Sequence, residues 1–254
     1  MYTPVQDGID KSAQSVQYTE AKPPKDLVEL VSCFWELKTI VPLDKDFHLH
    51  AVPNACVDIM FNEINTNIAG VTALRTTYEV LNLGREFHYV GIQFLPGVWK
   101  GSRDEIADQY IGSPYTGSLP LMETNDKMTG LSFLGKQLVM ARLVRQLASA
   151  NIVAVNDVTT ILLARLDDIR SVADMADATG LSSRQLQRVL KRTTGFSPHD
   201  LLKVYVYNKH LSRATQCYMP TSRTLFVRFG LLQATRQPSI LISSMSDIYN
   251  TYPM

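Results

Sequence analysis

The most informative segment of the chain is Ser171-Val-Ala-Asp-Met-Ala-Asp-Ala-Thr-Gly-Leu-Ser-Ser-Arg-Gln-Leu-Gln-Arg-Val-Leu-Lys-Arg-Thr-Thr-Gly195. It predicts two short helices joined by a tight turn. Ser171 is a residue type that caps helix N-termini, and the residues of the first helix that face inward are Val172, Met175 and Ala176. The small Ala176 lets a second helix cross closely over it. Gly180 supplies the positive φ that ends the first helix in a turn.

The second helix begins after Ser182, which is again a capping residue type. Leu181 returns the chain to the core, and Gly195 ends the helix. Three apolar residues face inward, namely Leu186, Val189 and Leu190. The residues left for the outer face are Arg184, Gln185, Gln187, Arg188, Lys191 and Arg192.

Two short helices with arginine and glutamine on the outer face of the second are typical of a helix-turn-helix whose second helix enters the DNA major groove. Arginine reads guanine and glutamine reads adenine by paired hydrogen bonds, while lysine and serine hold phosphates. The alternative interpretation is a structural helical hairpin with a solvated basic face. The helix-turn-helix pattern alone leaves both open.

The residues Leu181-Ser182, Arg184, Leu186-Gln187-Arg188, Leu190-Lys191 and Gly195-Phe196-Ser197-Pro198 resemble the first helix-turn-helix of the AraC/XylS family of bacterial transcription regulators. The resemblance covers about Asp167–Ala214. It implies that Arg184, Gln187 and Arg188 face bases and that Ser182, Ser183 and Lys191 complete the DNA-binding set. It also implies that Leu201–Thr215 forms a helix linking two helix-turn-helix units.

The second unit departs from the family pattern. Phe229-Gly230-Leu231 is similar to the family's second turn and Tyr252-Pro253 to its terminal Ser-Pro. The Asp, Ser-His-Phe and Phe-Lys that usually lie between them are missing. We therefore expect a degenerate second unit and one intact reading head.

The N-terminal half has short strand-like runs, at Phe47–Val52, Val57–Phe61, Thr77–Leu83 and Tyr89–Phe94. Before them, Leu27, Leu30, Val31 and Phe34 recur at near-helical spacing. Regular short strands separated by turn residues indicate a small antiparallel barrel or sandwich. Pro53-Asn54-Ala55-Cys56-Val57-Asp58-Ile59 and Gly91-Ile92-Gln93-Phe94-Leu95-Pro96-Gly97 resemble the cupin-like sensory domain found before AraC-type modules.

The predicted fold class is α+β, with a small antiparallel β-barrel-like N-terminal domain and an all-α helix-turn-helix domain. The predicted boundaries are 1–130 for a cupin-like effector or dimerisation domain, 131–155 for a helical linker and 156–254 for an AraC-like DNA-binding domain. In the linker, an apolar stripe over Gly135–Ser149 (Leu134, Leu138, Ala141, Val144 and Leu147) predicts a helix that packs on its own domain or forms a dimer seam.

Charge divides the chain in the same way. Residues 1–130 hold 10 Lys/Arg and 17 Asp/Glu, a net charge of −7, whereas residues 131–254 hold 15 and 7, a net charge of +8. An acidic regulatory half joined to a basic phosphate-binding half has this pattern, as has chance segregation of solvated charges. There is no membrane-length apolar run and no secretory h-region. The three cysteines form no CxxC pair, so we expect a cytoplasmic protein that binds no membrane.

Several other residues are of types that can carry chemistry. His48 and His50 lie on one strand face, but Asp58, Glu63 or His88 could complete a metal site only by folding, and we favour no metal. We expect Cys33 and Cys56 to be small buried residues rather than reactive thiols. Phe34, Trp35, Phe47, Phe61, Tyr89 and Phe94 form either a core or a pocket for a small-molecule effector. No nucleophile elbow or phosphate loop occurs.

The sequence therefore predicts a transcription regulator that binds double-stranded DNA, has no enzymatic activity and no cofactor, and responds to an unidentified signal. A small-molecule effector and a second copy of the chain are the further partners considered. The rival hypothesis is an interaction protein that has lost DNA binding with its second unit. A third hypothesis, a metal-dependent cupin enzyme, requires His48 and His50 to hold a metal.

Overall fold

The computed structural model describes residues 10–13, 15–51, 53–72, 74, 76, 79–102, 106–107 and 113–205. Strands precede helices, so the chain is a mixed α+β protein. The strands are β1 Asp10–Ala13, β2 Val16–Ala21, β3 Val31–Thr39, β4 Phe47–Ala51, β5 Asp58–Asn62, β6 Ala69–Thr72, β7 Glu79–Gly84, β8 His88–Phe94 and β9 Ile106–Ala107. The helices are the 3-10 turn η1 Lys25–Leu27, then α1 Leu121–Met128, α2 Phe133–Ser149, α3 Asp157–Ala164, α4 Val172–Thr179 and α5 Ser183–Thr194. A further helix occupies residues 198–205.

The strands form an open sheet and a separate ribbon. The sheet has seven strands in the order β1-β2-β3-β8-β5-β6-β9, and all neighbours are antiparallel except β6 and β9. The ribbon consists of β4 and β7. Among the described strands β1 and β9 end the sheet without pairing to each other, so the predicted barrel is wrong. Closure is not needed to bury the sheet, because other elements cover both of its faces.

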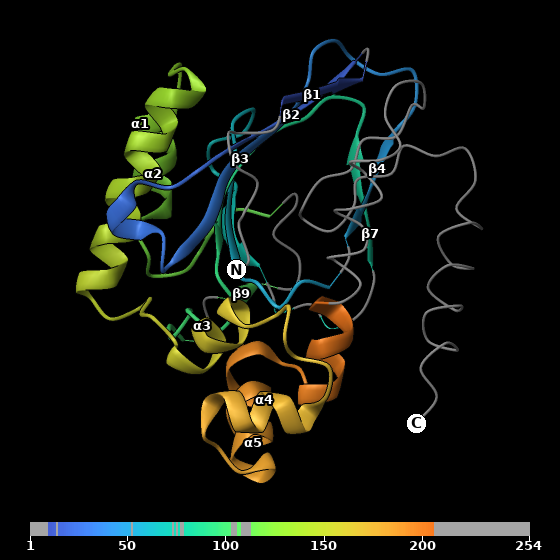
Figure 1. Cartoon of the computed structure of the whole chain (residues 1–254). Helices are drawn as coiled ribbons and strands as arrows, with labels where there is room; N and C mark the ends of the chain where they lie inside the picture. Colours follow the sequence, from blue (N-terminus) through green and yellow to red (C-terminus); the bar gives the residue numbers. More distant parts are fainter. Residues whose placement is uncertain are drawn as a thin grey trace.

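Neighbouring residues of the central strands point to opposite faces of the sheet. Phe34 of β3 packs in one hydrophobic core with Ile59 and Ile92, while Trp35 packs in a second with Tyr89. The first core includes residues of α1 and α2, and the second includes Leu49 and Leu83 of the ribbon. Figure 1 shows these layers, with α1 and α2 on one side of the sheet and β4 and β7 on the other. The six aromatic residues that could form a core or line a pocket are thus divided between two cores.

The stripe predicted on α2 is only partly buried. Ala141, Val144 and Leu147 are almost fully buried in the first core, as packing on the sheet requires. Leu134 and Leu138 are 68% and 61% exposed. The helix therefore turns one face to the sheet along its length, and the leucines of its N-terminal turns lie outside that face.

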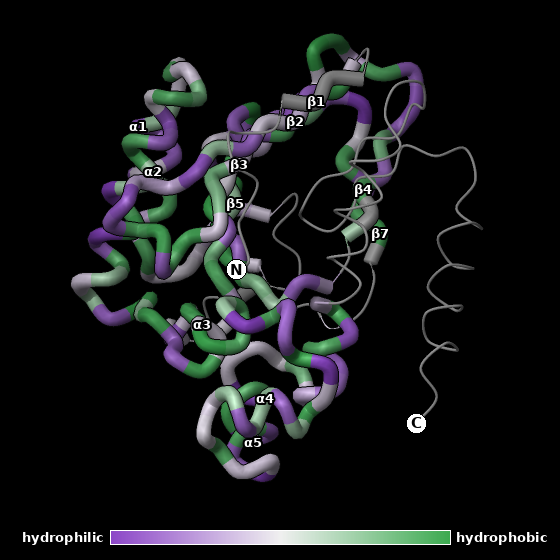
Figure 2. The backbone as a smooth tube through the Cα atoms, viewed as in Figure 1, coloured by the Kyte–Doolittle hydropathy of each residue, from purple (hydrophilic) through white to green (hydrophobic). Residues whose placement is uncertain are grey.

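The helices after α2 build a third core at one end of the sheet (Figure 1). Its buried members include Leu162 of α3, Met175 of α4 and Leu186 and Leu190 of α5. Figure 2 shows apolar and polar residues alternating along α4 and α5, the pattern of helices that bury one face. None of the helices in the described part of the chain is long and apolar enough to cross a membrane.

Candidate nucleic-acid interface

Helix α4 is fixed at both ends by the residues that the sequence predicts. The Ser171 hydroxyl accepts a hydrogen bond from the Asp174 amide at 3.2 Å, and the Asp174 carboxylate accepts one from the Ser171 amide at 2.9 Å. The Arg170 amide also donates to Asp174, and these hydrogen bonds lower the pKa of that carboxyl. Gly180 ends the helix at φ 65°. The turn therefore has the left-handed residue that it needs.

Helix α5 has a second capping box. The Ser182 hydroxyl accepts from the Gln185 amide at 3.3 Å, and the Gln185 side chain accepts from the Ser182 amide at 3.0 Å. Gly195 ends the helix at φ 77°. Helix α5 thus begins and ends where the sequence predicts, because capping and termination depend on residues within one turn of the helix end.

The outer face of α5 carries the three residues predicted to read bases. Leu186 and Leu190 are fully buried against α3 and α4, while Arg184, Gln187 and Arg188 are exposed. Spacings of three and four residues place these three side chains on one face, opposite the leucines. No other side chain or backbone group in the described ranges forms a hydrogen bond or ion pair with them. Their donors are available to a ligand.

The residues predicted at phosphates are also exposed, but two of them have partners within α5. The Ser182 hydroxyl donates to the Gln185 side chain at 2.8 Å in addition to its capping role. The Lys191 ammonium donates to the Gly195 carbonyl at 2.9 Å. Ser183 occupies the first turn of the helix. Exposed hydrogen bonds of this kind exchange readily with water, so Lys191 keeps access to an anion.

Charge is divided between the two helices. Helix α5 contains Arg184, Arg188, Lys191 and Arg192 and no acidic residue. Helix α4 contains Asp174 and Asp177 and no basic residue. The field of this unit is therefore positive over the outer face of α5, where an anionic polymer would be attracted.

The chain continues from α5 as the resemblance implies. The Asp200 amide donates to the Ser197 hydroxyl at 3.2 Å, so Ser197 caps the next helix and Pro198 begins it. The predicted linker helix Leu201–Thr215 is helical as far as Tyr205. Its remainder and the predicted second unit, including Phe229-Gly230-Leu231 and Tyr252-Pro253, lie outside the described residues.

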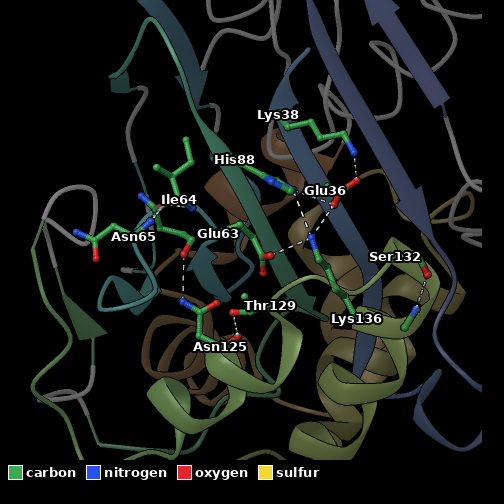
Figure 3. Close-up of polar contacts among 12 residues, drawn as sticks. Glu36, Lys38, Glu63, Ile64, Asn65, His88, Asn125, Thr129, Ser132 and Lys136 are labelled. Carbon is green, nitrogen blue, oxygen red and sulfur yellow. Dashed lines mark hydrogen bonds and ion pairs between the residues drawn. The ribbon is translucent and has the colours of Figure 1, made fainter. Parts of the chain in front are cut away.

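A buried ion cluster that the sequence did not indicate joins α2 to the sheet (Figure 3). The Lys136 ammonium lies 3.2 Å from Glu36 Oε1 and 3.0 Å from Glu63 Oε2, and all three side chains are at most 6% exposed. His88 Nε2 lies 2.9 Å from Glu36 Oε1, and the Lys38 ammonium lies 2.9 Å from Glu36 Oε2. Sequence patterning missed this cluster because Lys136 lies outside the predicted stripe, on the side of the helix away from Leu134 and Leu138, and its partners are distant in sequence.

The cluster holds Glu36 ionised. Burial raises the pKa of its carboxyl, but hydrogen bonds from His88 and Lys38 and the charge of Lys136 outweigh it and lower the pKa to about 2. Lys136 is thereby compensated by two carboxylates, which a buried ammonium requires. The cluster fastens α2 to the sheet.

The other candidate residues do not gather into a site. His48 and His50 lie on β4 of the ribbon, whereas His88 and Glu63 belong to the ion cluster. The described part of the chain holds no group of three or more His, Cys, Asp or Glu side chains that could bind a metal ion. Cys33 and Cys56 are buried, as predicted. The side chain of His50 and all of Cys217 lie outside the described part.

Comparison with known proteins reaches only the N-terminal half. Residues 19–110 match a family model described as a domain of unknown function, DUF6597. The match covers little more than a third of the chain and contains β3 to β8 and both glutamates of the ion cluster. No AraC or helix-turn-helix model matches, so that resemblance stays a prediction. No curated protein and no solved structure matches the chain. The chain is thus similar, over residues 19–110, to a family whose function is not established.

Proposed function

We propose that this protein is a cytoplasmic DNA-binding transcription regulator whose helix α5 enters the major groove of double-stranded DNA. The observation that supports it most is the outer face of α5. Arg184, Gln187 and Arg188 form one exposed row, opposite the buried Leu186 and Leu190, and their side chains bond to no other group of the described residues. Arginine and glutamine are the side chains that pair with guanine and adenine edges.

The charge distribution supports the same proposal. Helix α5 has four basic residues and no acidic one, whereas α4 has two acidic residues and no basic one. A basic helix of this kind is suited to bind a polyanion rather than a neutral partner. The resemblance to the AraC/XylS pattern places the same residues at bases. The N-terminal half would then serve as the sensor, and the direction of regulation stays open.

The test is titration of purified variants against the site mapped by chromatin binding in the native host and against a scrambled duplex, at one salt concentration. We expect Arg184→Ala and Gln187→Ala each to lose about 1–3 kcal/mol on the mapped site and little on the scrambled one, because base contacts carry the sequence information. Lys191→Ala should weaken both duplexes alike.

Arg165→Ala is the matched control, because Arg165 is exposed at the end of α3 and outside the proposed reading face. It should leave the mapped site as tightly bound as before. Equal losses for all variants on both duplexes would instead show a solvated basic face. The rival interaction protein predicts no specific site at all, and the exposed leucines Leu134 and Leu138 of α2 are the observation that favours it.

A further inference from the structure

The loop between β4 and β5 connects the sheet to the core beneath α5. Ala55 of this loop is 1% exposed and packs in the third core with Leu186 and Leu190. All other buried members of that core in the described chain come from residues 162–205. We call α3, α4, α5 and the helix at 198–205 the helical unit. Ala55 is therefore the point at which the N-terminal half enters the core of the helical unit.

The backbone of Ala55 adopts a conformation that alanine rarely has. Its φ is 62°, in the left-handed region. The Asn54 side chain accepts a hydrogen bond from the Cys56 amide at 3.0 Å and helps to close the turn. A strained residue of this kind persists only where its surroundings impose it. The docked helical unit supplies those surroundings.

The other end of the loop is attached to the middle of the sheet. The Phe94 amide donates to the Val57 carbonyl at 2.9 Å, and the Asp58 amide donates to the Thr72 hydroxyl at 2.8 Å. Strand β5, which begins at Asp58, pairs with both β8 and β6. Only Cys56 and Val57 therefore separate Ala55 from a central strand.

Two further contacts hold the helical unit against the same half. The Asn156 amide nitrogen donates to the Gly97 carbonyl at 3.1 Å, and the Thr159 hydroxyl donates to the Pro96 carbonyl at 2.6 Å. At the end of α5, a Cβ on Gly195 would lie 3.3 Å from the Thr76 methyl. The unit is thus docked at both ends of its contact with the sheet and at Ala55.

We propose that the loop Pro53–Val57 is a relay that couples the sheet to α5, so that a displacement of β5 changes the packing of α5 through Ala55. The docked arrangement imposes the left-handed Ala55, and undocking allows it to relax. The two arrangements differ in how firmly α5 is held. This coupling is a property of the protein without DNA, so its test is independent of the proposed function.

The test is hydrogen exchange of the full chain, resolved over Leu186–Thr194. Ala55→Ser keeps the strain and places a hydroxyl in an apolar core, and we expect exchange there to accelerate on the order of tenfold. Asn156→Asp retains the side-chain oxygen that caps α3 but removes the donor to Gly97, and should act in the same direction. Asn156→Asp provides the test if Ala55→Ser does not fold. Ala69→Ser, at a buried strand alanine of the first core, is the control and should leave α5 unchanged.

Transmission is tested with Thr72→Val, which removes the hydrogen bond at the start of β5 without changing side-chain volume. In this single variant, hydrogen exchange over α5 should accelerate. In the double variant with Ala55→Ser, exchange should be no faster than in Ala55→Ser alone, because both substitutions act through the same loop. Unchanged α5 exchange in Thr72→Val and Asn156→Asp, or an equal effect of Ala69→Ser, would overturn the relay.

Discussion

Lys136 is a basic residue on the buried face of α2, whose other buried residues are apolar. Its ammonium is neutralised by Glu36 and Glu63, which are as deeply buried as the lysine itself. Three buried charges stay in place because each has its partner within hydrogen-bonding distance. Removing one partner leaves a buried charge uncompensated, which costs more than the pair itself contributes.

Lys136→Met should therefore destabilise the protein by about 3–5 kcal/mol. The measurement is urea unfolding followed by tryptophan fluorescence. The triple variant Lys136→Met, Glu36→Gln, Glu63→Gln removes all three charges and should recover most of the loss. Lys127→Met, which breaks an exposed pair with Glu123, is the matched control and should change stability little. A triple variant as unstable as the single one would contradict this account.

Glu36 also predicts a pH dependence. Because its pKa is about 2 in the folded protein and near the ordinary 4.5 when unfolded, its ionised form contributes stability that is complete above about pH 4.5. That contribution is lost as the pH falls towards 2. Its size is up to about 3 kcal/mol. The free energy of unfolding of Glu36→Gln should be well below that of the parent at pH 6 and approach it at pH 3.

Glu123→Gln is the control for this titration. The pKa of Glu123 is also lowered, by its hydrogen bond to Lys127, but the side chain is 68% exposed. The same pair of measurements should give almost no difference between Glu123→Gln and the parent at either pH. A Glu36 difference that stayed constant from pH 6 to pH 3 would show that the loss is steric rather than electrostatic.

At the scale of elements, α4 and α5 depend on how closely they cross. Ala176 of α4 is half-buried and packs against the third core. Its carbonyl accepts a hydrogen bond from the Leu181 amide in the turn. A small side chain here lets the turn and α5 approach α4. The crossing is therefore sensitive to added volume.

Ala176→Leu should overpack the crossing and lower the free energy of unfolding by about 1–3 kcal/mol. Thermal unfolding is the measurement. Ala173→Leu is the matched control, because Ala173 is on the exposed face of the same helix and should tolerate the larger side chain. Equal melting temperatures for Ala176→Leu and the parent would show that the two helices do not cross closely at Ala176.

At the scale of the whole molecule, the charge asymmetry decides how binding responds to salt. The acidic N-terminal half and the basic face of α5 belong to one chain with a net charge of +1. Attraction to DNA must therefore come from local cations rather than from the overall charge. Each phosphate that they neutralise releases condensed counterions.

The affinity for DNA should consequently fall steeply as salt rises. Removing one phosphate contact, by Lys191→Ala, should make the slope of log K against log salt shallower by about 0.9. Fluorescence anisotropy with a labelled duplex from 50 to 200 mM salt measures both slopes. A slope near zero for the parent chain would argue against DNA binding and for the interaction protein.

The features that can be predicted from the sequence alone are local ones. Ser171, Gly180, Ser182 and Gly195 act on groups within one helical turn, so their pattern predicts the bounds of α4 and α5 and the outer face of α5. The alternating runs predict β4, β5, β7 and β8 for the same reason. The helical spacing of Leu27 to Phe34 was misleading, because η1 covers only one turn before β3 begins at Val31.

Tertiary structure decided everything that depends on distant partners. The sheet stays open because α1 and α2 cover one face and the β4–β7 ribbon covers the other. No pattern within a single strand specifies such layers. Lys136 is stable among apolar residues only because β3 and the end of β5 bring Glu36 and Glu63 to it. Ala55, which has a left-handed backbone conformation, packs into a helical core more than 100 residues further along the chain. In each case the deciding energy comes from contacts between segments whose separation in sequence leaves no local signature.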